Sequence, residues 1–192
     1  YAQPAERAFG QWGAQIEYLG EKGFPPLKIT GSKLKGGAIQ VDATLSSQFV
    51  SALLLAAPLL QGPSSLEITG DLVSQPYIEM TIGQMRQFGL KVVRDDARHY
   101  QIQPQKVQSP GEILVEGDAT AASYFLAAGA IGLGPVRVCG AGSHSVQGEI
   151  RFAELLEQMG AEVTWGPNWV EVSRAADSPL RGISRDLNDI PD

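Results

Sequence analysis

Three consecutive polar residues, Ser46, Ser47 and Gln48, stand directly before a long apolar run in the sequence TLSSQFVSALLLAAPLL (44–60). The leucines of that run can form the buried face of a helix, which puts the polar residues at its amino end. The first amides of a helix lack partners within it and the dipole is positive there, so this position attracts anions. Two hydroxyls and a carboxamide add donors suited to a phosphate or a carboxylate. The simpler alternative is that one serine caps the helix while the other is exposed.

The stretch GDLVSQPYIEM (70–80) predicts a second helix start of the same kind. Ser74 and Gln75 precede Pro76, a residue favoured in the first turn of a helix. Tyr77 could lay its ring against a small substrate and offer its hydroxyl; the alternative is a half-buried packing residue. Turns from strand to helix line up along one edge of an open α/β sheet, so we expect the two helix starts to be neighbours.

The elements that must position these residues repeat along the chain. The segment VDATLSSQFVSALLLAAPLLQGPSSLEITG (41–70) resembles EGDATAASYFLAAGAIGLGPVRVCG (116–140). A second motif, in which a helix ends at a glycine and two strands follow, occurs three times, at Gly13, Gly89 and Gly160. A glycine at this position is typical of the left-handed residue that ends a helix. The combined unit is β-α-β-α-β-β, which predicts a layered α/β fold.

The repeat is cut at both ends. Residues 1–30 contain only the second half of a unit, α-β-β. At the other end, SRDLNDIPD (184–192) aligns with QVDATLSSQ (40–48), so a third apolar helix should begin where the sequence stops. Because a unit that cannot bury its own apolar face is unstable alone, we expect a segment of a longer array or one half of a split protein.

The composition limits the class of protein. An apolar fraction of 43% and a charged fraction of 19% are ordinary for a globular protein. A net charge of −6 argues against a nucleic-acid partner, and the absence of a run of about 18 apolar residues argues against a membrane span. The lone Cys139 fits a reducing compartment such as the cytoplasm, and its context VRVCG predicts a buried strand thiol. There is no Cys/His cluster with metal spacing, so neither a metal nor another cofactor is expected.

Four stretches then carry a resemblance to a known family. LSSQF, GDLVSQPYIEM, LVEGDATAASYFLAAGAI and DLNDIPD, in this order, resemble 5-enolpyruvylshikimate-3-phosphate (EPSP) synthases, the enolpyruvyl transferases of the shikimate pathway. The resemblance implies two similar domains, each of three β-α-β-α-β-β units, that close on the substrates at a hinge. Residues 1–115 would then belong to the shikimate 3-phosphate-binding domain and residues 116–192 to the second domain.

The resemblance also implies roles for the polar residues at the two helix starts. Ser46, Ser47 and Ser74 would hold the phosphate of shikimate 3-phosphate. Gln48 would reach both that substrate and the enolpyruvyl group arriving from phosphoenolpyruvate, and Tyr77 would pack against the shikimate ring. In the implied reaction, the enolpyruvyl group moves to the 5-hydroxyl of shikimate 3-phosphate and phosphate leaves.

Proton transfer and charge neutralisation need further groups. Asp192, in the PD motif, matches the family's aspartate that contacts the substrate hydroxyls and is a candidate for proton transfer. The family's lysine- and arginine-bearing loops and its GNAGT-type loop have no counterpart here, although cations are needed to offset the substrate charges. We therefore expect this chain alone to be inactive and to need a complementary chain or segment.

Three alternatives remain open at this stage. The transferase that acts on UDP-N-acetylglucosamine shares the fold and the chemistry, although LSSQF and SQPYI fit the shikimate enzyme better. A non-catalytic anion-binding module, or a split half that requires a partner chain, belongs to a different class. Processing of RNA ends on a related repeat is disfavoured by the negative charge.

Overall fold

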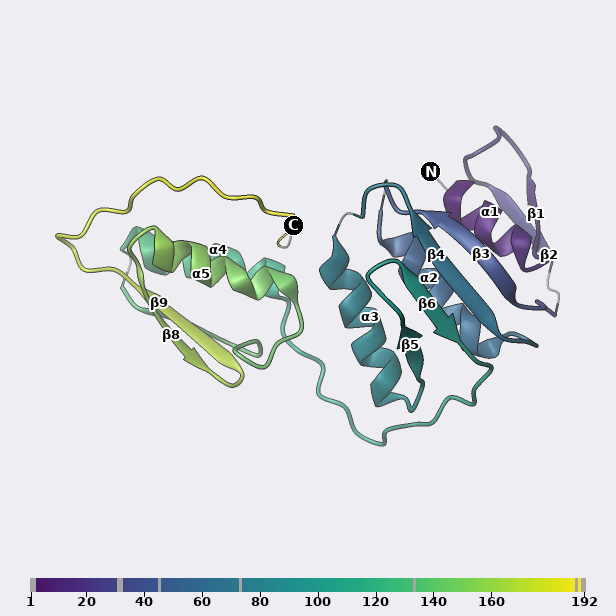
Figure 1. Ribbon diagram of the computed structural model, residues 1–192. Coiled ribbons are helices and arrows are strands. Elements are labelled where there is room, and N and C mark those ends of the chain that lie inside the picture. Colours follow the sequence, from purple (N-terminus) through teal and green to yellow (C-terminus); the bar gives the residue numbers. More distant parts are fainter. Residues whose placement is uncertain are drawn as a thin grey trace. The chain divides into compact units, whose positions relative to one another are not determined.

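The computed structural model describes residues 3–30, 33–44, 46–72, 74–132, 134–188 and 190, with side chains from residue 6 onward. The chain divides into two compact units, Tyr1–Gly111 and Glu112–Asp192, and each has its own hydrophobic core. The division falls four residues before the boundary expected from the sequence. Figure 1 traces the elements of each unit.

The first unit contains one complete repeat preceded by half of another. Its opening half-repeat consists of α1 (Gln3–Gln11), β1 (Gln15–Tyr18) and β2 (Leu27–Thr30). The complete repeat runs through β3 (Gly37–Asp42), α2 (Gln48–Ala56), a 3₁₀ turn (Ala57–Leu59), β4 (Ser64–Thr69), α3 (Gln75–Gln87), β5 (Val92–Arg94) and β6 (His99–Ile102). The predicted order β-α-β-α-β-β is therefore confirmed, and so is the α-β-β half-repeat before it.

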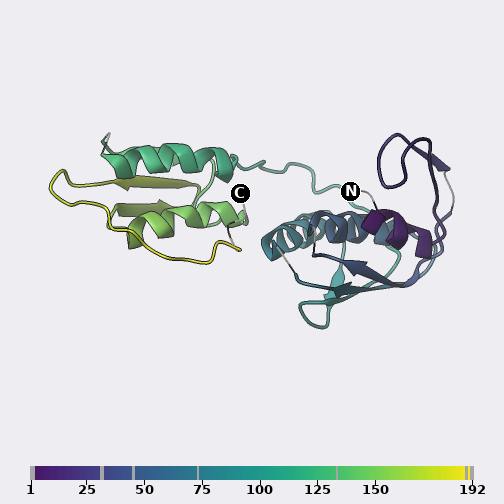
Figure 2. The same ribbon diagram turned by 90° about the horizontal axis from the view of Figure 1, so that it is seen from above.

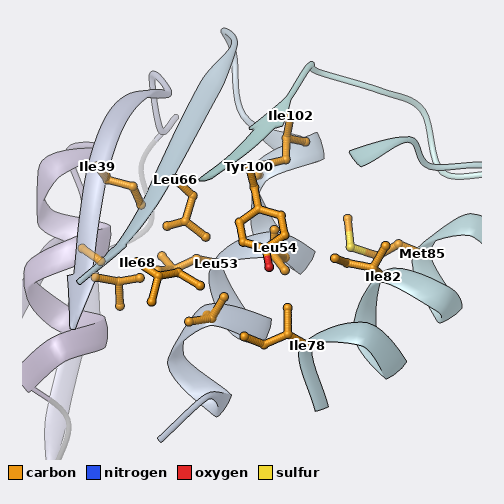
Figure 3. Close-up of a cluster of buried hydrophobic side chains, with 14 of the residues drawn as sticks. Ile39, Leu53, Leu54, Leu66, Ile68, Ile78, Ile82, Met85, Tyr100 and Ile102 are labelled. Atoms are coloured by element: carbon orange, nitrogen blue, oxygen red, sulfur yellow. The ribbon is translucent and has the colours of Figure 1, made fainter. Parts of the chain in front are cut away.

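Four of these strands form one sheet in the order β3-β4-β6-β5, in which β3 and β4 are parallel and the other pairs are antiparallel. Figure 2 shows α1, α2 and α3 in a row along one face of this sheet. Side chains alternate between the two faces of a strand, so each strand turns every second residue toward the helices. Strand residues such as Ile39, Leu66 and Tyr100 meet Leu53 of α2 and Ile78 of α3 in a fully packed core (Figure 3).

Each of the three repeated glycines ends a helix in the predicted way. Gly13, Gly89 and Gly160 have φ angles of 97°, 75° and 105°, all in the left-handed region that glycine adopts without a Cβ clash. The chain can then turn back from each helix into the following strand. The predicted glycine conformation is confirmed at all three positions.

The second unit has the same order of elements except at its start. It runs through α4 (Ala119–Ile131), β7 (Val136–Cys139), a 3₁₀ turn (Gly148–Arg151), α5 (Phe152–Gln158), β8 (Glu162–Gly166) and β9 (Trp169–Ser173). The strands form an antiparallel sheet in the order β7-β9-β8, and Figure 1 shows α4 and α5 together on one face of it.

The strand that the repeat predicts before α4 is absent. Residues 113–117 are in neither a helix nor a strand. The end of the segment is held by the Gly117 amide, which bonds the Gly140 carbonyl just after β7 at 2.9 Å, and by the Gln147 side chain, which donates to Glu116 and to the Gly117 carbonyl at 3.0 and 2.7 Å. A strand needs a hydrogen-bonded neighbour along its length, and this segment has none. The apolar pattern ILVE was not sufficient to form one.

The prediction of a buried thiol at Cys139 was wrong. Cys139 lies on β7 as expected, but β7 is an edge strand and the thiol is exposed. Val136 and Val138 of the same strand are the half-buried residues, so the alternation of the strand turns Cys139 outward together with Arg137. In the part of the chain that the structure describes, no helix is both long and apolar enough to cross a membrane.

Candidate anion-binding site

Two helix starts of the first unit meet at one edge of the sheet. Because β3 and β4 are parallel with Asp42 opposite Thr69, their carboxyl ends lie side by side. The chain leaves β3 through the α2 mouth, defined here as residues 43–44 and 46–48. It leaves β4 through the α3 mouth, residues 70–72 and 74–77. The polar residues singled out in the sequence lie in these two mouths.

One hydrogen bond joins the two mouths directly, and others hold its surroundings. The Thr44 amide donates to the Asp42 carboxylate at 2.9 Å, and the Thr44 hydroxyl accepts from the Asp71 amide at 3.3 Å. On the other side, the Arg98 guanidinium donates to the Gly70 carbonyl at 2.6 Å and to the Ile68 carbonyl at 3.4 Å. The α3 mouth is therefore held between a hydroxyl of the α2 mouth and the Arg98 cation from the turn between β5 and β6.

The two serines of the α2 mouth have different surroundings. The Ser46 hydroxyl accepts a hydrogen bond from the Gln48 amide at 3.1 Å. Ser47 occupies the N-cap position, yet its side chain makes no capping hydrogen bond, and the residue is only 1% exposed. One half of the simple alternative agrees with the structure, because the Ser46 hydroxyl bonds the first amide of α2, and the other half does not, because Ser47 is buried and not exposed. The Gln48 side chain is exposed at the mouth.

The α3 mouth has an unusual backbone. Ser74 has φ 53° and ψ 44°, the only left-handed conformation of a residue other than glycine among those described. Its carbonyl accepts from the Tyr77 amide at 3.2 Å, and Pro76 lies in the first turn as predicted. Such conformations cost energy and are concentrated at functional sites. Tyr77 is half-buried in this first turn.

A hydrogen bond between the two helices fixes their relative position near the mouths. The hydroxyl oxygens of Ser51 and Thr81 lie 2.8 Å apart. Residues four apart share one face of a helix, so Ser47 lies one turn before Ser51, and Tyr77 lies one turn before Thr81. The buried serine and the tyrosine are consequently on neighbouring faces of α2 and α3.

The second copy of the repeat lacks this arrangement. There, the Asp118 carboxylate accepts from the Thr120 amide at 2.9 Å and the Ala121 amide at 3.3 Å, and α4 begins directly after it. In the first copy, α2 begins six residues after Asp42, at Gln48. The serine that matches Ser47 in the second copy is thus inside a helix, where its hydroxyl bonds the backbone. In the first copy, by contrast, residues between Asp42 and α2 form the mouth, where Ser46 is half-buried and Gln48 is exposed.

A depression elsewhere on the first unit does not suit an anion. It measures about 370 Å³ on the outer face of the sheet, and carboxylates of Glu67 and Asp95 line it together with Gln40 and Gln101. Negative groups on its wall oppose phosphate and carboxylate ligands. Within the described ranges, no group of three or more His, Cys, Asp or Glu residues could hold a metal ion.

Comparison with known proteins decides the family. The family model for EPSP synthase (3-phosphoshikimate 1-carboxyvinyltransferase) matches residues 3–192. This chain belongs to the EPSP synthase family. It is 52% identical to the 3-phosphoshikimate 1-carboxyvinyltransferase of Pseudoalteromonas atlantica over 183 residues, which are 95% of this chain and 42% of that protein. It is 49% identical to the enzyme of the same name from Vibrio atlanticus over 186 residues, 96% of this chain and 43% of the relative.

Solved structures show the same fold. An EPSP synthase from Acinetobacter baumannii matches with a TM-score of 0.69 and 27% identity over 98% of this chain and 43% of its own. The enolpyruvyl transferase NikO from Streptomyces tendae matches with a TM-score of 0.71 over 94% of this chain and 43% of its own, at 17% identity. The enolpyruvyl transferase fold inferred from the sequence is confirmed. The chain spans less than half the length of these EPSP synthases and of NikO.

One of the site residues inferred from the sequence, Asp192, lies outside the residues that the structure describes. Asp42 and Thr44 connect the two mouths, and the sequence marks them only by the Asp-Ala-Thr triplet that recurs at 118–120. The sequence feature that distinguishes the first triplet is the serine pair, Ser46 and Ser47, which has no counterpart after the second triplet.

Proposed function

We propose that this chain carries the shikimate 3-phosphate side of an EPSP synthase active site, in an enzyme that transfers the enolpyruvyl group of phosphoenolpyruvate to the 5-hydroxyl of shikimate 3-phosphate. The observation that carries the proposal is the meeting of two hydroxyl-bearing helix mouths at one sheet edge, joined by the Thr44–Asp71 hydrogen bond. Two positive helix ends directed at one place suit a doubly charged phosphate. Membership of the EPSP synthase family supports this choice over a UDP-sugar substrate.

Each polar residue of the mouths has a role in this proposal. Ser46, Ser47 and Ser74 donate hydroxyl hydrogen bonds to the phosphate of shikimate 3-phosphate. Gln48, exposed beside them, reaches that substrate and the incoming enolpyruvyl group. Tyr77, half-buried on the first turn of α3, packs its ring against the shikimate ring.

The chemistry is an addition followed by an elimination. The 5-hydroxyl adds to phosphoenolpyruvate to give a tetrahedral adduct, and loss of phosphate from that adduct leaves the enolpyruvyl ether. A general acid and base must serve the hydroxyl and the methylene carbon, and we assign Asp192 to this proton transfer. Cations must offset the phosphate and carboxylate charges, and we assign them to segments of the enzyme outside this chain. No metal or organic cofactor takes part in this scheme.

A complementary chain or segment is the partner we propose, and this chain alone would be inactive. Tyr124, Phe125 and Ile131 of α4 are 77%, 62% and 64% exposed, an apolar stripe that supports packing against further polypeptide. Mixing this chain with the remaining segments of a relative such as the Vibrio atlanticus enzyme should restore turnover. The net charge of −6 and the lone cysteine support a cytoplasmic protein without nucleic-acid or membrane partners.

Calorimetric titration of the 192-residue chain tests the proposal. We expect saturable binding of shikimate 3-phosphate, much weaker binding of shikimate, which lacks the phosphate, and no turnover when phosphoenolpyruvate is added. Equal binding of shikimate and shikimate 3-phosphate would remove the phosphate role of the serines. Preferential binding of UDP-N-acetylglucosamine would instead favour the sister transferase, and turnover by the chain alone would refute the need for a partner.

A further inference from the structure

The Thr44 side chain lies between the two mouths and touches both. Its hydroxyl accepts the Asp71 amide at 3.3 Å, and its own amide donates to the Asp42 carboxylate at 2.9 Å. Thr44 therefore bonds the end of β3 through its backbone and the α3 mouth through its side chain. The result is a continuous connection from the end of β3 to the start of the α3 mouth.

The close approach of the two mouths depends on a residue without a side chain. Gly70 has φ 73°, and a Cβ there would lie 2.2 Å from Thr44 Oγ1 and 2.6 Å from Asp42 Oδ1. The Thr44 hydroxyl therefore occupies the space that any other residue at position 70 would fill. The Arg98 guanidinium, bonded to the Gly70 carbonyl at 2.6 Å, holds the same residue from the turn between β5 and β6.

We propose that Thr44, held by Asp42, is a positioning residue that sets the separation of the two helix mouths and so brings their serines to one phosphate. Thr44 precedes Ser46 and Ser47 by two and three residues, and Asp71 precedes Ser74 by three. A change in the distance between Thr44 and Asp71 therefore moves both sets of hydroxyls, because only two or three residues separate them along the chain. Phosphate binding depends on donors fixed in advance, because each donor left to be ordered on binding lowers the affinity. The proposal rests on the proposed function, and Thr44 itself is not assigned a contact with substrate.

The second copy of the repeat supplies a matched comparison. There, the same Asp-Ala-Thr triplet forms an ordinary helix cap, in which the Thr120 amide bonds the Asp118 carboxylate at 2.9 Å. That cap lies within α4, and the contact to the following helix start comes from Gln147, whose side chain accepts the Ala119 amide at 2.9 Å. Thr44 and Thr120 therefore follow the same Asp-Ala pair but make different contacts, so a substitution at Thr120 controls for the chemistry of the change.

The experiment compares Thr44→Val, Thr44→Ser and Thr120→Val in the 192-residue chain. Valine keeps the shape of threonine and removes its hydroxyl, whereas serine keeps the hydroxyl. We expect Thr44→Val to weaken shikimate 3-phosphate binding about tenfold in calorimetry, and the other two variants to stay within about twofold of wild type. Hydrogen exchange at the Asp71 amide should become faster in Thr44→Val alone. Rescue by serine, with similar melting temperatures for the two valine variants, separates positioning from a general loss of stability.

Each outcome supports or overturns the positioning role of Thr44. Wild-type affinity in Thr44→Val, or an equal loss in Thr120→Val, would overturn the positioning role. If the wild-type chain itself binds no shikimate 3-phosphate, the proposed function fails for this chain. Hydrogen exchange at the Asp71 amide then tests whether Thr44 connects the two mouths. Unchanged exchange of the Asp71 amide in Thr44→Val would then overturn the proposal without any ligand.

Discussion

The hydroxyl oxygens of Ser51 and Thr81 lie 2.8 Å apart and join α2 to α3 one helical turn after the two mouths. The Thr81 hydroxyl is also 2.8 Å from the Tyr77 carbonyl, so the connection continues to the first turn of α3. Farther from the mouths than this polar contact, the same two helices pack through buried residues such as Leu54 and Ile82. The hydroxyl pair is therefore the polar end of an otherwise apolar helix contact, at the level where the site begins.

Replacing Thr81 with valine should loosen the two helices at this point. We expect a loss of about 1 kcal/mol in the free energy of unfolding, because a part-buried hydrogen bond is removed while the shape is kept. Shikimate 3-phosphate affinity should fall as well. Urea denaturation of Thr81→Val, Ser51→Ala and the double variant forms a double-mutant cycle that gives the interaction energy of the two hydroxyls. Thr164→Val, at an exposed position of β8, is the control. Strictly additive effects would show that the two hydroxyls are not coupled.

Ser47→Ala should separate binding from folding. The Ser47 side chain makes no capping hydrogen bond, so its removal should change the free energy of unfolding by less than about 0.5 kcal/mol. Loss of one donor to a phosphate should nevertheless weaken shikimate 3-phosphate binding about tenfold or more, since hydrogen bonds to charged groups are strong. Calorimetry and urea denaturation of the same preparation measure both quantities.

Two further serine variants complete this test. Ser46→Ala removes the acceptor of the Gln48 amide, and we expect it to cost about 0.5 to 1 kcal/mol of stability in addition to affinity. Ser123→Ala changes the matching serine of the second copy, whose hydroxyl bonds the Thr120 carbonyl at 2.7 Å, and should leave affinity unchanged. If Ser47→Ala binds shikimate 3-phosphate as tightly as wild type, Ser47 has a structural role and no role in binding.

Local patterns predicted most of the fold. The spacing of apolar residues and the glycines after helices depend on neighbours within a few residues, and the order β-α-β-α-β-β across 37–102 followed from them. Contacts between distant segments could not be predicted in this way. The apolar segment 113–117 has no partner strand, and Cys139 lies on the face of β7 that the core does not cover. In both cases, the outcome depends on which segments pack against the strand and not on its own sequence.

The site shows the same limit. The sequence places serines near the starts of α2 and α3, since caps and first turns are local features. It does not show that the Asp-Ala-Thr triplet caps α4 after Asp118 but is followed by an open mouth after Asp42. That difference arises where Thr44 meets Asp71, a contact across 27 residues of chain. Which serine bonds the backbone, Ser46 or Ser47, likewise depends on the path that the open mouth takes.

The Asp42 carboxylate should make stability depend on pH in the acidic range. Hydrogen bonds from the Thr44 side chain and then from its amide lower the pKa of Asp42 below the unfolded value of about 3.9. A depressed folded-state pKa stabilises the fold above the unfolded pKa, and this stabilisation is lost as the pH falls through the folded pKa. The free energy of unfolding of Asp42→Asn should therefore fall below that of wild type at pH 7, and the gap should close below about pH 4. Urea denaturation from pH 7 to pH 3 measures the gap.

Gly70→Ala should be more harmful than its backbone conformation alone explains. A left-handed residue other than glycine costs about 1 kcal/mol, and Gly13→Ala measures that cost because φ is 97° there and a Cβ would have nothing within 4 Å. At Gly70, the added Cβ would also lie 2.2 Å from Thr44 Oγ1, so the two mouths must move apart. We expect Gly70→Ala to lose roughly 1 kcal/mol or more beyond Gly13→Ala in urea denaturation, together with most of its affinity for shikimate 3-phosphate. Equal costs at the two glycines would mean that the contact between Gly70 and Thr44 yields freely, and that the spacing of the mouths is set by other contacts.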